Sequence, residues 1–296
     1  MNTTENENIE IRLLLEAIHL KYGYDFRRYA QASVKRRIHR RLERSGLHSI
    51  SEMQHEVLCD TAFFEALLLD LSINVTEMFR DPSFFSALRE HVLPALAGQP
   101  FIKIWHAGCS TGEEVYSMAI LLKEMGLDAK TRIYATDVNE VVLKKAREGI
   151  FAIDQIKKHT ANYQKAGGTE SFGDYYAAHY DSVIMDKSLK ENIVFADHNL
   201  VTDAVFGEMD MIVCRNVMIY FNRELQDRVF QLFCDSLCDE GFLCIGSKES
   251  VRFSTCESHF ESVVDAQKIY RKKRLADPGQ VRSTPESRSR SVGAQP

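Results

Sequence analysis

The stretch His106-Ala107-Gly108-Cys109-Ser110-Thr111-Gly112-Glu113-Glu114 decides the fold class of this chain. It follows the apolar run 102–105 and precedes a helical pattern over 115–125, so it predicts a strand, a turn of small residues and a helix start. That order opens a βαβ unit that binds a dinucleotide or a nucleoside. Glu113 and Glu114 suit a helix N-terminus, but they repel phosphate where a pyrophosphate would lie. The turn therefore favours a positively charged nucleoside, and S-adenosylmethionine (SAM) fits that description.

The rest of the C-terminal two thirds alternates between strand and helix patterns. We expect strands over 102–107, 132–136, 192–196, 211–214 and 241–246, helices over 113–125, 139–148 and 223–237, and a last strand or an antiparallel pair within 262–271. This alternation predicts a mostly parallel sheet with helices on both faces. The connection over about 150–190 is rich in Tyr and Gly and is long enough to hold an inserted subdomain.

Residues 9 to about 85 are expected to be helical throughout. The segment 27–44 contains eight Lys and Arg residues against one acid, a local charge of +7. Val34, Ile38 and Leu42 recur every fourth residue and predict one buried seam. The basic faces of this helix fit three interpretations: docking to an acidic protein surface, a solvated face, or binding to nucleic acid.

Composition restricts the class of protein further. The chain has 296 residues, 45% hydrophobic residues and a net charge of −5, which fits one large core with a small second unit. No apolar stretch is long enough to span a membrane, and residues 1–10 resemble neither a signal nor a transit peptide. Seven cysteines without a C-x-x-C pair indicate reduced, buried thiols in a cytoplasmic protein, and we expect no metal. The polar tail after about 275 is expected to be disordered.

Polar residues follow several of the predicted strands. Asp137 ends the second strand, where an acid accepts hydrogen bonds from ribose hydroxyls, although it would also serve as a helix N-cap. Asn199 follows the third strand and would meet an adenine edge or hold its own loop turn. Arg215, Asn216 and Tyr220 follow the fourth strand, where the transferred group would lie, and core packing of Tyr220 is the alternative.

The segment 74–82 precedes the first strand. Asn74 and Thr76 are turn or N-cap formers, and Pro82 suits a helix start, so the segment alone would be a linker. The side chains of Asn74, Thr76 and Arg80 would also be able to close over a bound nucleoside.

Four of these motifs together resemble one known family. Ile73-Asn74-Val75-Thr76-Glu77-Met78-Phe79-Arg80, Ser110-Thr111-Gly112-Glu113-Glu114, Ala135-Thr136-Asp137 and Cys214-Arg215-Asn216-Val217-Met218-Ile219-Tyr220-Phe221 look like the chemotaxis receptor glutamate methyltransferases, the CheR family. The resemblance covers about residues 10–272. The turn at 106–109 and the segment Gly246-Ser247-Lys248-Glu249-Ser250, where G-H-S-E is more usual, depart from the family pattern.

The resemblance implies an α/β fold with three parts. These are an N-terminal all-helical domain with a basic receptor-docking helix and a linker (9–85), a Rossmann-like SAM-dependent methyltransferase domain (86–275) with a β-subdomain inserted at about 150–190, and a disordered tail (276–296). In some family members the β-subdomain captures a receptor peptide by strand addition.

The resemblance also implies a role for particular residues. SAM would contact Asn74, Thr76, Arg80, Glu114, Asp137, Asn199, Leu200, Arg215 and Asn216. Arg80 and Tyr220 would be the catalytic residues nearest the methyl-transfer point. Docking to the receptor would use Arg36, Arg37, Arg40, Arg41 and Arg44.

The implied function is methylation of glutamate side chains in chemoreceptors for sensory adaptation, with S-adenosylhomocysteine (SAH) as the product. The partner would be the cytoplasmic helical bundle of a chemoreceptor, bound by a monomer that neither binds nucleic acid nor inserts into a membrane. One alternative is a non-catalytic module that senses SAM or scaffolds receptors. An NAD-dependent oxidoreductase is disfavoured, because the turn lacks G-x-G-x-x-G and carries two carboxylates.

Overall fold

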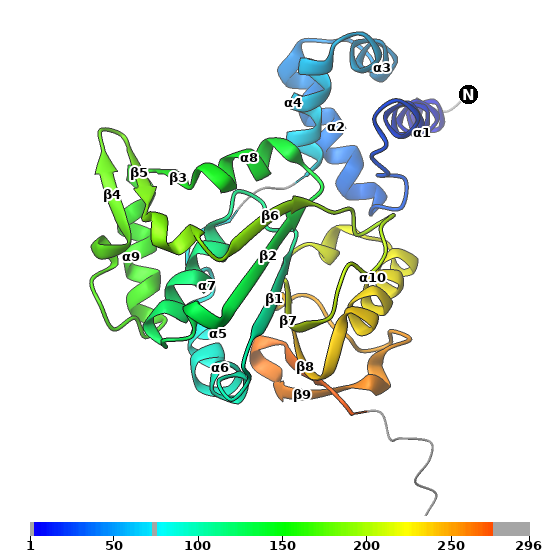
Figure 1. Ribbon diagram of the computed structural model, residues 1–296. Coiled ribbons are helices and arrows are strands. Elements are labelled where there is room, and N and C mark those ends of the chain that lie inside the picture. Colours follow the sequence, from blue (N-terminus) through cyan, green and yellow to red (C-terminus); the bar gives the residue numbers. More distant parts are fainter. Residues whose placement is uncertain (1–2, 73–75, 275–296) are drawn as a thin grey trace, which may run out of the picture.

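The computed structural model describes residues 3–72 and 76–274. Asn74 and the tail 276–296 therefore lie outside the described residues. In Figure 1 a small helical unit stands at the top, a central sheet forms the body, and a second, small sheet lies at the left. In the described part of the chain, every helix is too short or too polar to cross a membrane.

The helical unit consists of α1 (Thr3–Tyr22), α2 (Gln31–Ser45), α3 (Ile50–Cys59) and α4 (Thr61–Leu71). Local signals set the ends of these helices: Ser49 and Asp60 cap the N-termini of α3 and α4, and Gly46 ends α2 in a left-handed conformation. The predicted seam of α2 is buried at Val34 and Ile38, inside a hydrophobic core of residues 14–71.

The central sheet has the strand order β6-β2-β1-β7-β8-β10-β9. Its strands are β1 (Ile102–Ala107), β2 (Thr131–Asp137), β6 (Ile193–Asp197), β7 (Met209–Cys214), β8 (Leu237–Ile245), β9 (Phe260–Val264) and β10 (Ile269–Lys272). The first five in this order are parallel, whereas β10 pairs antiparallel with both β8 and β9. This confirms the predicted α/β class and the antiparallel pair at the edge.

Helices cover both faces of this sheet. Ile104 points into a core shared with α5 (Pro82–Ala87), η1 (Leu88–Val92), α6 (Leu93–Leu96), α7 (Glu113–Glu124) and α8 (Glu140–Glu148). The next residue, Trp105, points into the opposite core beside α10 (Arg223–Ser236). Successive strand residues alternate between the two cores, as a sheet buried on both faces requires. Short turns of helix complete this domain: η2 (Asp128–Lys130), η6 (Met218–Tyr220), η7 (Glu257–His259) and η8 (Asp265–Gln267).

The insertion forms a separate antiparallel sheet of order β3-β5-β4. It contains β3 (Ile150–Ala152), η3 (Ile153–Gln155), α9 (Ile156–Lys165), η4 (Phe172–Tyr175), β4 (Tyr176–His179), β5 (Ser182–Met185) and η5 (Lys187–Lys190). Glu124 at the end of α7 accepts hydrogen bonds from the hydroxyls of Tyr163 and Tyr175 and forms an ion pair with Arg89. This buried cluster attaches the inserted β-subdomain to the main body.

The boundary of the helical unit lies earlier than residue 85. Its core ends at Leu71, whereas Met78, Phe79, Phe84 and Phe85 are buried in the core of the sheet domain. The predicted boundary was too late because α5 is helical, so a helical pattern alone does not reveal which core the helix joins.

Candidate functional site

An open cleft lies where β1, β2, β6 and β7 end at their carboxyl edges. It encloses about 1080 Å³, including its mouth, and has walls from four regions of the chain. The residues that line it are Tyr29, Leu71, Ser72, Thr76, Arg80, Gly108, Cys109, Ser110, Glu114, Asp137, Val138, His198, Asn199, Leu200, Val201, Arg215, Asn216, Val217, Tyr220 and Phe221. In parallel α/β sheets, ligands bind at this edge. All the predicted cofactor and catalytic residues that the structure describes therefore line one cleft.

The glycine turn after β1 forms the floor of the cleft. The N–H groups of Gly108 and Cys109 both donate to the carbonyl of Thr136, at 2.8 and 2.9 Å, which ties this turn to the end of β2. Gly108 has φ +79°, and a Cβ added there would lie 2.5 Å from Cγ2 of Val217. Only glycine allows the turn to approach the loop after β7 this closely.

Asp137 organises the same turn from the end of β2. Its Oδ2 accepts the N–H of Ser110 at 2.9 Å, and its Oδ1 accepts the N–H of Asn139 at 3.0 Å. The N-cap of α8 is Asn139, whose side chain accepts the N–H of Val141. Burial raises the pKa of Asp137, and hydrogen bonds from the backbone N–H groups of Asn139, Ser110 and Val138 oppose that shift. Because a carboxylate has about four acceptor positions, Asp137 can still accept hydrogen bonds from a ligand in the cleft.

Glu114 is the acid of the helix start that faces the cleft. Its Oε1 lies 3.2 Å from Nδ1 of His106, and its Oε2 lies 2.8 Å from the guanidinium of Arg215. Burial would raise the pKa of Glu114, but the hydrogen bond from His106 and the charge of Arg215 hold it below its usual range. Glu114 is thus a carboxylate at neutral pH. Glu113 does not line the cleft, and its side chain accepts from the hydroxyl of Thr111 instead.

Arg215 joins three segments of the chain beneath the cleft. Its side chain is 3% exposed and pairs with Glu114 and, at 2.6 Å, with Asp81. It also donates to the carbonyl of Arg80 and lies over the ring of Phe84, 4.0 Å from the ring centre. The segment before α5, the start of α7 and the end of β7 are therefore held together by one buried cation.

Asn199 lies at the cleft with its backbone fixed by its own side chain. Its Oδ1 accepts the N–H of Val201 at 2.9 Å, which is the loop turn proposed as the alternative to adenine binding. Its backbone N–H donates to the carboxylate of Asp203. The two interpretations are compatible, because the amide NH₂ group remains a donor for a ligand edge. Leu200 lines the cleft next to it and supplies apolar surface.

Tyr220 is positioned by the helical unit. The N–H of Ala30 donates to the carbonyl of Tyr220 at 2.8 Å, and the guanidinium of Arg37 lies 4.6 Å from the centre of its ring. Burial raises the pKa of Tyr220, although Arg37, Arg80 and Arg36 oppose the shift. Its hydroxyl is therefore protonated at neutral pH and can donate a hydrogen bond into the cleft.

Glu249 is an important residue that the sequence analysis did not single out. It is buried after β8, where its carboxylate accepts the N–H groups of Gly246, Asn216 and Ile219. Burial raises its pKa against these donors. Asn216 has φ +61°, a left-handed conformation that Glu249 helps to hold. The sequence signal was its place in the segment 246–250, which departs from the more usual G-H-S-E of the family but keeps the Gly and the Glu.

The predicted docking arginines of α2 divide into three groups. Arg37 is 5% exposed and donates to the carbonyl of Leu71, so its assignment to a docking surface was wrong: it packs between the helical unit and Tyr220. Arg41 and Arg44 both pair with Asp70 of α4. Arg36 and Arg40 are exposed, and no ion pair holds them within residues 3–72 and 76–274.

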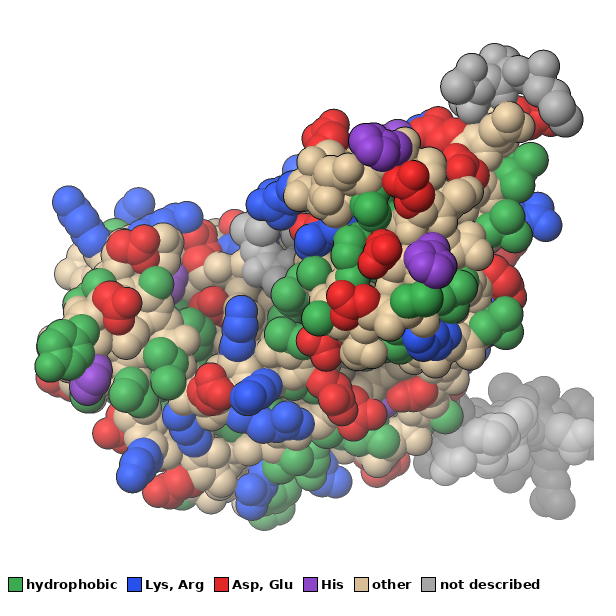
Figure 2. Space-filling view, turned by 90° about the horizontal axis from the view of Figure 1, so that it is seen from above, with side chains coloured by type: hydrophobic (Ala, Val, Ile, Leu, Met, Phe, Trp, Pro, Cys, Tyr) green, Lys and Arg blue, Asp and Glu red, His purple; other side chains and the backbone are tan. Residues whose placement is uncertain are grey.

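Acidic neighbours neutralise much of the +7 charge of the segment 27–44. Arg27 pairs with Asp25 and Glu16, and Lys35 pairs with Glu7 of α1. Figure 2, which views the molecule from above, shows basic and acidic side chains interspersed over the upper surface. The surface is therefore a local basic patch, which we define as Arg36 and Arg40, rather than a broad positive field.

A parallel sheet with a glycine turn and acids at its carboxyl edge is a Rossmann-like arrangement of the class that binds a nucleoside or a dinucleotide. Two family models match the chain: "CheR methyltransferase, SAM binding domain" over residues 74–268, and "CheR methyltransferase, all-alpha domain" over residues 9–72. The chain therefore belongs to the CheR methyltransferase family.

The curated relatives described here match between 77% and 92% of this chain. "Putative methyltransferase Cher3" of Pseudomonas putida is 53% identical over 92% of this chain and 100% of its own length. "Chemotaxis protein methyltransferase" of Listeria monocytogenes is 31% identical over 77% of this chain and 85% of its own. The protein of the same name from Escherichia coli is 29% identical over 84% of this chain and 86% of its own.

Proposed function

We propose that this protein transfers the methyl group of SAM to glutamate side chains of chemoreceptors, and that it serves adaptation in chemotaxis. The observation that carries the proposal is the cleft itself: Glu114, Asp137, Arg80 and Tyr220 meet there in a chain of the CheR family. The names of the Listeria and Escherichia relatives support a role in chemotaxis. The cytoplasmic location and the monomeric state belong to the same proposal.

The cleft offers SAM complementary groups along its length. Asp137 would accept hydrogen bonds from the ribose hydroxyls, and Asn199 and Leu200 would bound the adenine. Glu114 adds negative charge that would attract the ammonium group of SAM. The positive charge of Arg215 neutralises only part of the negative charge of Glu114, Asp81 and Asp137. Thr76, Arg80 and Asn216 would complete the contacts.

The reaction needs no general base. A free glutamate has a pKa of about 4.3, so the attacking carboxylate is already ionised at neutral pH. An O–CH₃ bond forms while the S–CH₃ bond breaks, and the electron pair of that bond goes to sulfur, which leaves as the neutral thioether of SAH. The protein positions the two reactants and removes water from the carboxylate. Arg80 would orient this carboxylate or the carboxylate end of SAM, and Tyr220 would donate a hydrogen bond at the methyl-transfer site.

The labelled product tests the proposal directly. The full-length protein is incubated with methyl-labelled SAM and membranes containing chemoreceptors, and the volatile methanol released by alkali is counted. A glutamyl methyl ester releases base-labile methanol, whereas N-methyl groups do not. If the protein binds SAH but labels no receptor, the result would support the cofactor site and contradict the catalytic role.

Tyr220→Phe is expected to lower kcat by about tenfold, because one hydrogen bond to the reacting groups is worth roughly 1.5 kcal/mol when it is charge-assisted. The affinity for SAH should stay within about twofold, because the ring and its stacking with Arg37 are kept. The measurement is steady-state methyl transfer combined with calorimetry. An unchanged kcat would remove Tyr220 from the catalytic residues.

Reversal of the basic patch, Arg36→Glu with Arg40→Glu, is expected to raise KM for the receptor about tenfold at low salt and by much less at high salt. The affinity for SAH should be unchanged, because neither side chain lines the cleft. Lys144→Glu with Lys145→Glu on α8 is the matched control, since both lysines are exposed and the change in charge is identical. Equal effects of the two pairs would reject a local docking patch.

A further inference from the structure

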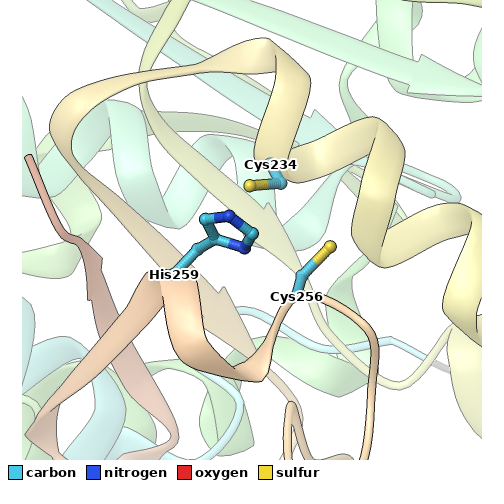
Figure 3. Close-up of side chains that lie close together, drawn as sticks. All are labelled: Cys234, Cys256 and His259. Atoms are coloured by element: carbon cyan, nitrogen blue, oxygen red, sulfur yellow. The ribbon is translucent and has the colours of Figure 1, made fainter. Parts of the chain in front are cut away.

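A cluster of two cysteines and one histidine lies on the α10 side of the sheet, outside the cleft. The ligand atoms of Cys234, Cys256 and His259 all lie within 4.8 Å of one another. Figure 3 shows the ring of His259 beside both sulfur atoms, with Cys234 reaching it from α10 and Cys256 from the loop before η7. The three residues thus come from α10 and from the loop that contains η7, which meet at this point.

The cluster is shielded from solvent and has unused ligand capacity. Cys256 is fully buried, and Cys234 is 5% exposed. Nδ1 of His259 is buried and has no hydrogen-bond partner among residues 3–72 and 76–274. A buried polar atom without a partner is costly, so its position beside two thiols calls for an explanation.

The local backbone brings the two residues of the loop together. Cys256 and His259 form a C-x-x-H pair across η7, and the N–H of His259 donates to the carbonyl of Cys256 at 3.0 Å. Cys234 lies in the last turn of α10, 22 positions earlier in the sequence. That separation explains why a search for C-x-x-C pairs in the sequence did not find the cluster.

We propose that Cys234, Cys256 and His259 bind a structural zinc ion. Two thiols and an imidazole are the donor set that Zn²⁺ selects. With Zn–S of about 2.3 Å and Zn–N of about 2.0 Å, a tetrahedral site places its donor atoms roughly 3.5–3.8 Å apart. The three ligand atoms therefore need to approach one another by at most about 1.0–1.3 Å from the 4.8 Å spread.

Gln231 is placed to provide the fourth ligand. It lies one turn before Cys234 on α10, and its Oε1 is 3.2 Å from Sγ of Cys256. In the metal-free protein this oxygen accepts the thiol proton of Cys256. On binding, each thiol releases its proton to solvent, two Zn–S bonds form, and no atom is oxidised or reduced. The amide oxygen of Gln231, or a water molecule that it holds, then completes the tetrahedron.

The zinc ion would fasten the end of α10 to the loop that connects β8 and β9. The same loop carries Glu249, which holds the backbone of Asn216 and Ile219 at the cleft. The expected role is therefore stabilisation of the β8–β10 edge. The proposal does not rest on the methyltransferase activity.

The test uses the full-length, reduced protein after treatment with a chelator. Titration with Co²⁺ should give one equivalent of a tetrahedral, thiolate-ligated spectrum, and added Zn²⁺ should displace it and raise Tm. Cys234→Ser and His259→Gln should each weaken Zn²⁺ binding by at least about 100-fold, since even outer-shell changes cost 10–100-fold. The matched control is Cys59→Ser on α3, because Cys59 lies 3.7 Å from the exposed His55 and forms a second Cys–His pair with it.

Cysteine labelling covers the case in which a variant fails to fold. At a denaturant concentration that opens the metal-free wild-type protein to the reagent, Zn²⁺ should slow the alkylation of the buried Cys234 and Cys256, as mapped by mass spectrometry, and should leave the labelling of the exposed Cys59 unchanged. The proposal is overturned if Co²⁺ gives no thiolate spectrum, if the signal disappears in Cys59→Ser instead, or if Zn²⁺ protects neither buried cysteine.

Discussion

Replacement of Arg215 by methionine is expected to lower the free energy of unfolding by about 3 kcal/mol, the lower end of the cost of breaking a buried ion pair. The lower end applies because Asp81, one of the two partners, is 48% exposed, whereas Glu114 is only 18% exposed. Methionine keeps most of the volume over Phe84 but leaves Glu114 without its cation. Denaturant unfolding with a constant m-value measures the change.

The pH dependence identifies the cause of that loss. The pKa of Glu114 is lower in the folded protein than its unfolded value of 4.5. Glu114 therefore stabilises the fold at pH values above 4.5, and this stabilisation is lost as the pH falls through the pKa of the folded state. In Arg215→Met the pKa of Glu114 should rise, because the charge of Arg215 is gone. The difference in the free energy of unfolding between the variant and the wild type should therefore become smaller as the pH falls below about 4.5.

Arg223→Met is the matched control for Arg215→Met. Arg223 is exposed at the start of α10, where it donates to the carbonyl of Phe253 and lies 6.0 Å from the centre of the Phe253 ring. Its replacement should cost less than about 1 kcal/mol. Equal costs at both positions, or a difference for Arg215→Met that stays constant with pH, would contradict the role given to the Glu114–Arg215 pair.

Asp137→Ala is expected to weaken SAH binding by about 100-fold, which corresponds to roughly 2.7 kcal/mol. The carboxylate accepts the N–H groups of Ser110 and Asn139, and each charge-assisted hydrogen bond is worth about 1.5–3 kcal/mol. Without it, both the acceptor proposed for the ribose and the support of the glycine turn are lost. Calorimetry with SAH measures the affinity, and circular dichroism checks that the variant is folded.

Asp197→Ala provides a closely matched control for Asp137→Ala. Asp197 ends β6 and is the register partner of Asp137 at the end of β2, but it is exposed and does not line the cleft. Its replacement should leave SAH affinity within about twofold. If Asp137→Ala binds SAH as tightly as Asp197→Ala does, the assignment of Asp137 to the cofactor site is wrong.

Much of the fold could be predicted from local sequence patterns. The strands of the central sheet and the helices 113–124, 140–148 and 223–236 agree with the expected ranges to within a few residues. Their signals are strong because both faces of each central strand are buried and because Gly126 and Gly149 follow two of the helices. The cleft residues could be predicted because carboxyl ends of parallel strands meet at one edge.

The remaining features depend on contacts between distant segments. Arg37 lies in the same basic stretch of sequence as Arg36 and Arg40, so its neighbours in the sequence do not distinguish it from them. It is buried because α2 packs against Tyr220. Glu249 lies 33 positions from Asn216, so nothing local indicates that its carboxylate holds that backbone. The pairing of Cys234 with Cys256 and His259 likewise requires the position of α10 against the end of the sheet.

The helical unit supplies Tyr29 and Leu71 to the wall of the cleft, although it has a hydrophobic core of its own. A small molecule bound in the cleft contacts the helical unit and the sheet domain at once. Its binding free energy is therefore lost when either of the two units unfolds. Mass action then stabilises the two cores together. Calorimetric unfolding should consequently become a single, more cooperative transition at saturating SAH, even though no covalent or packing contact between the units has been added.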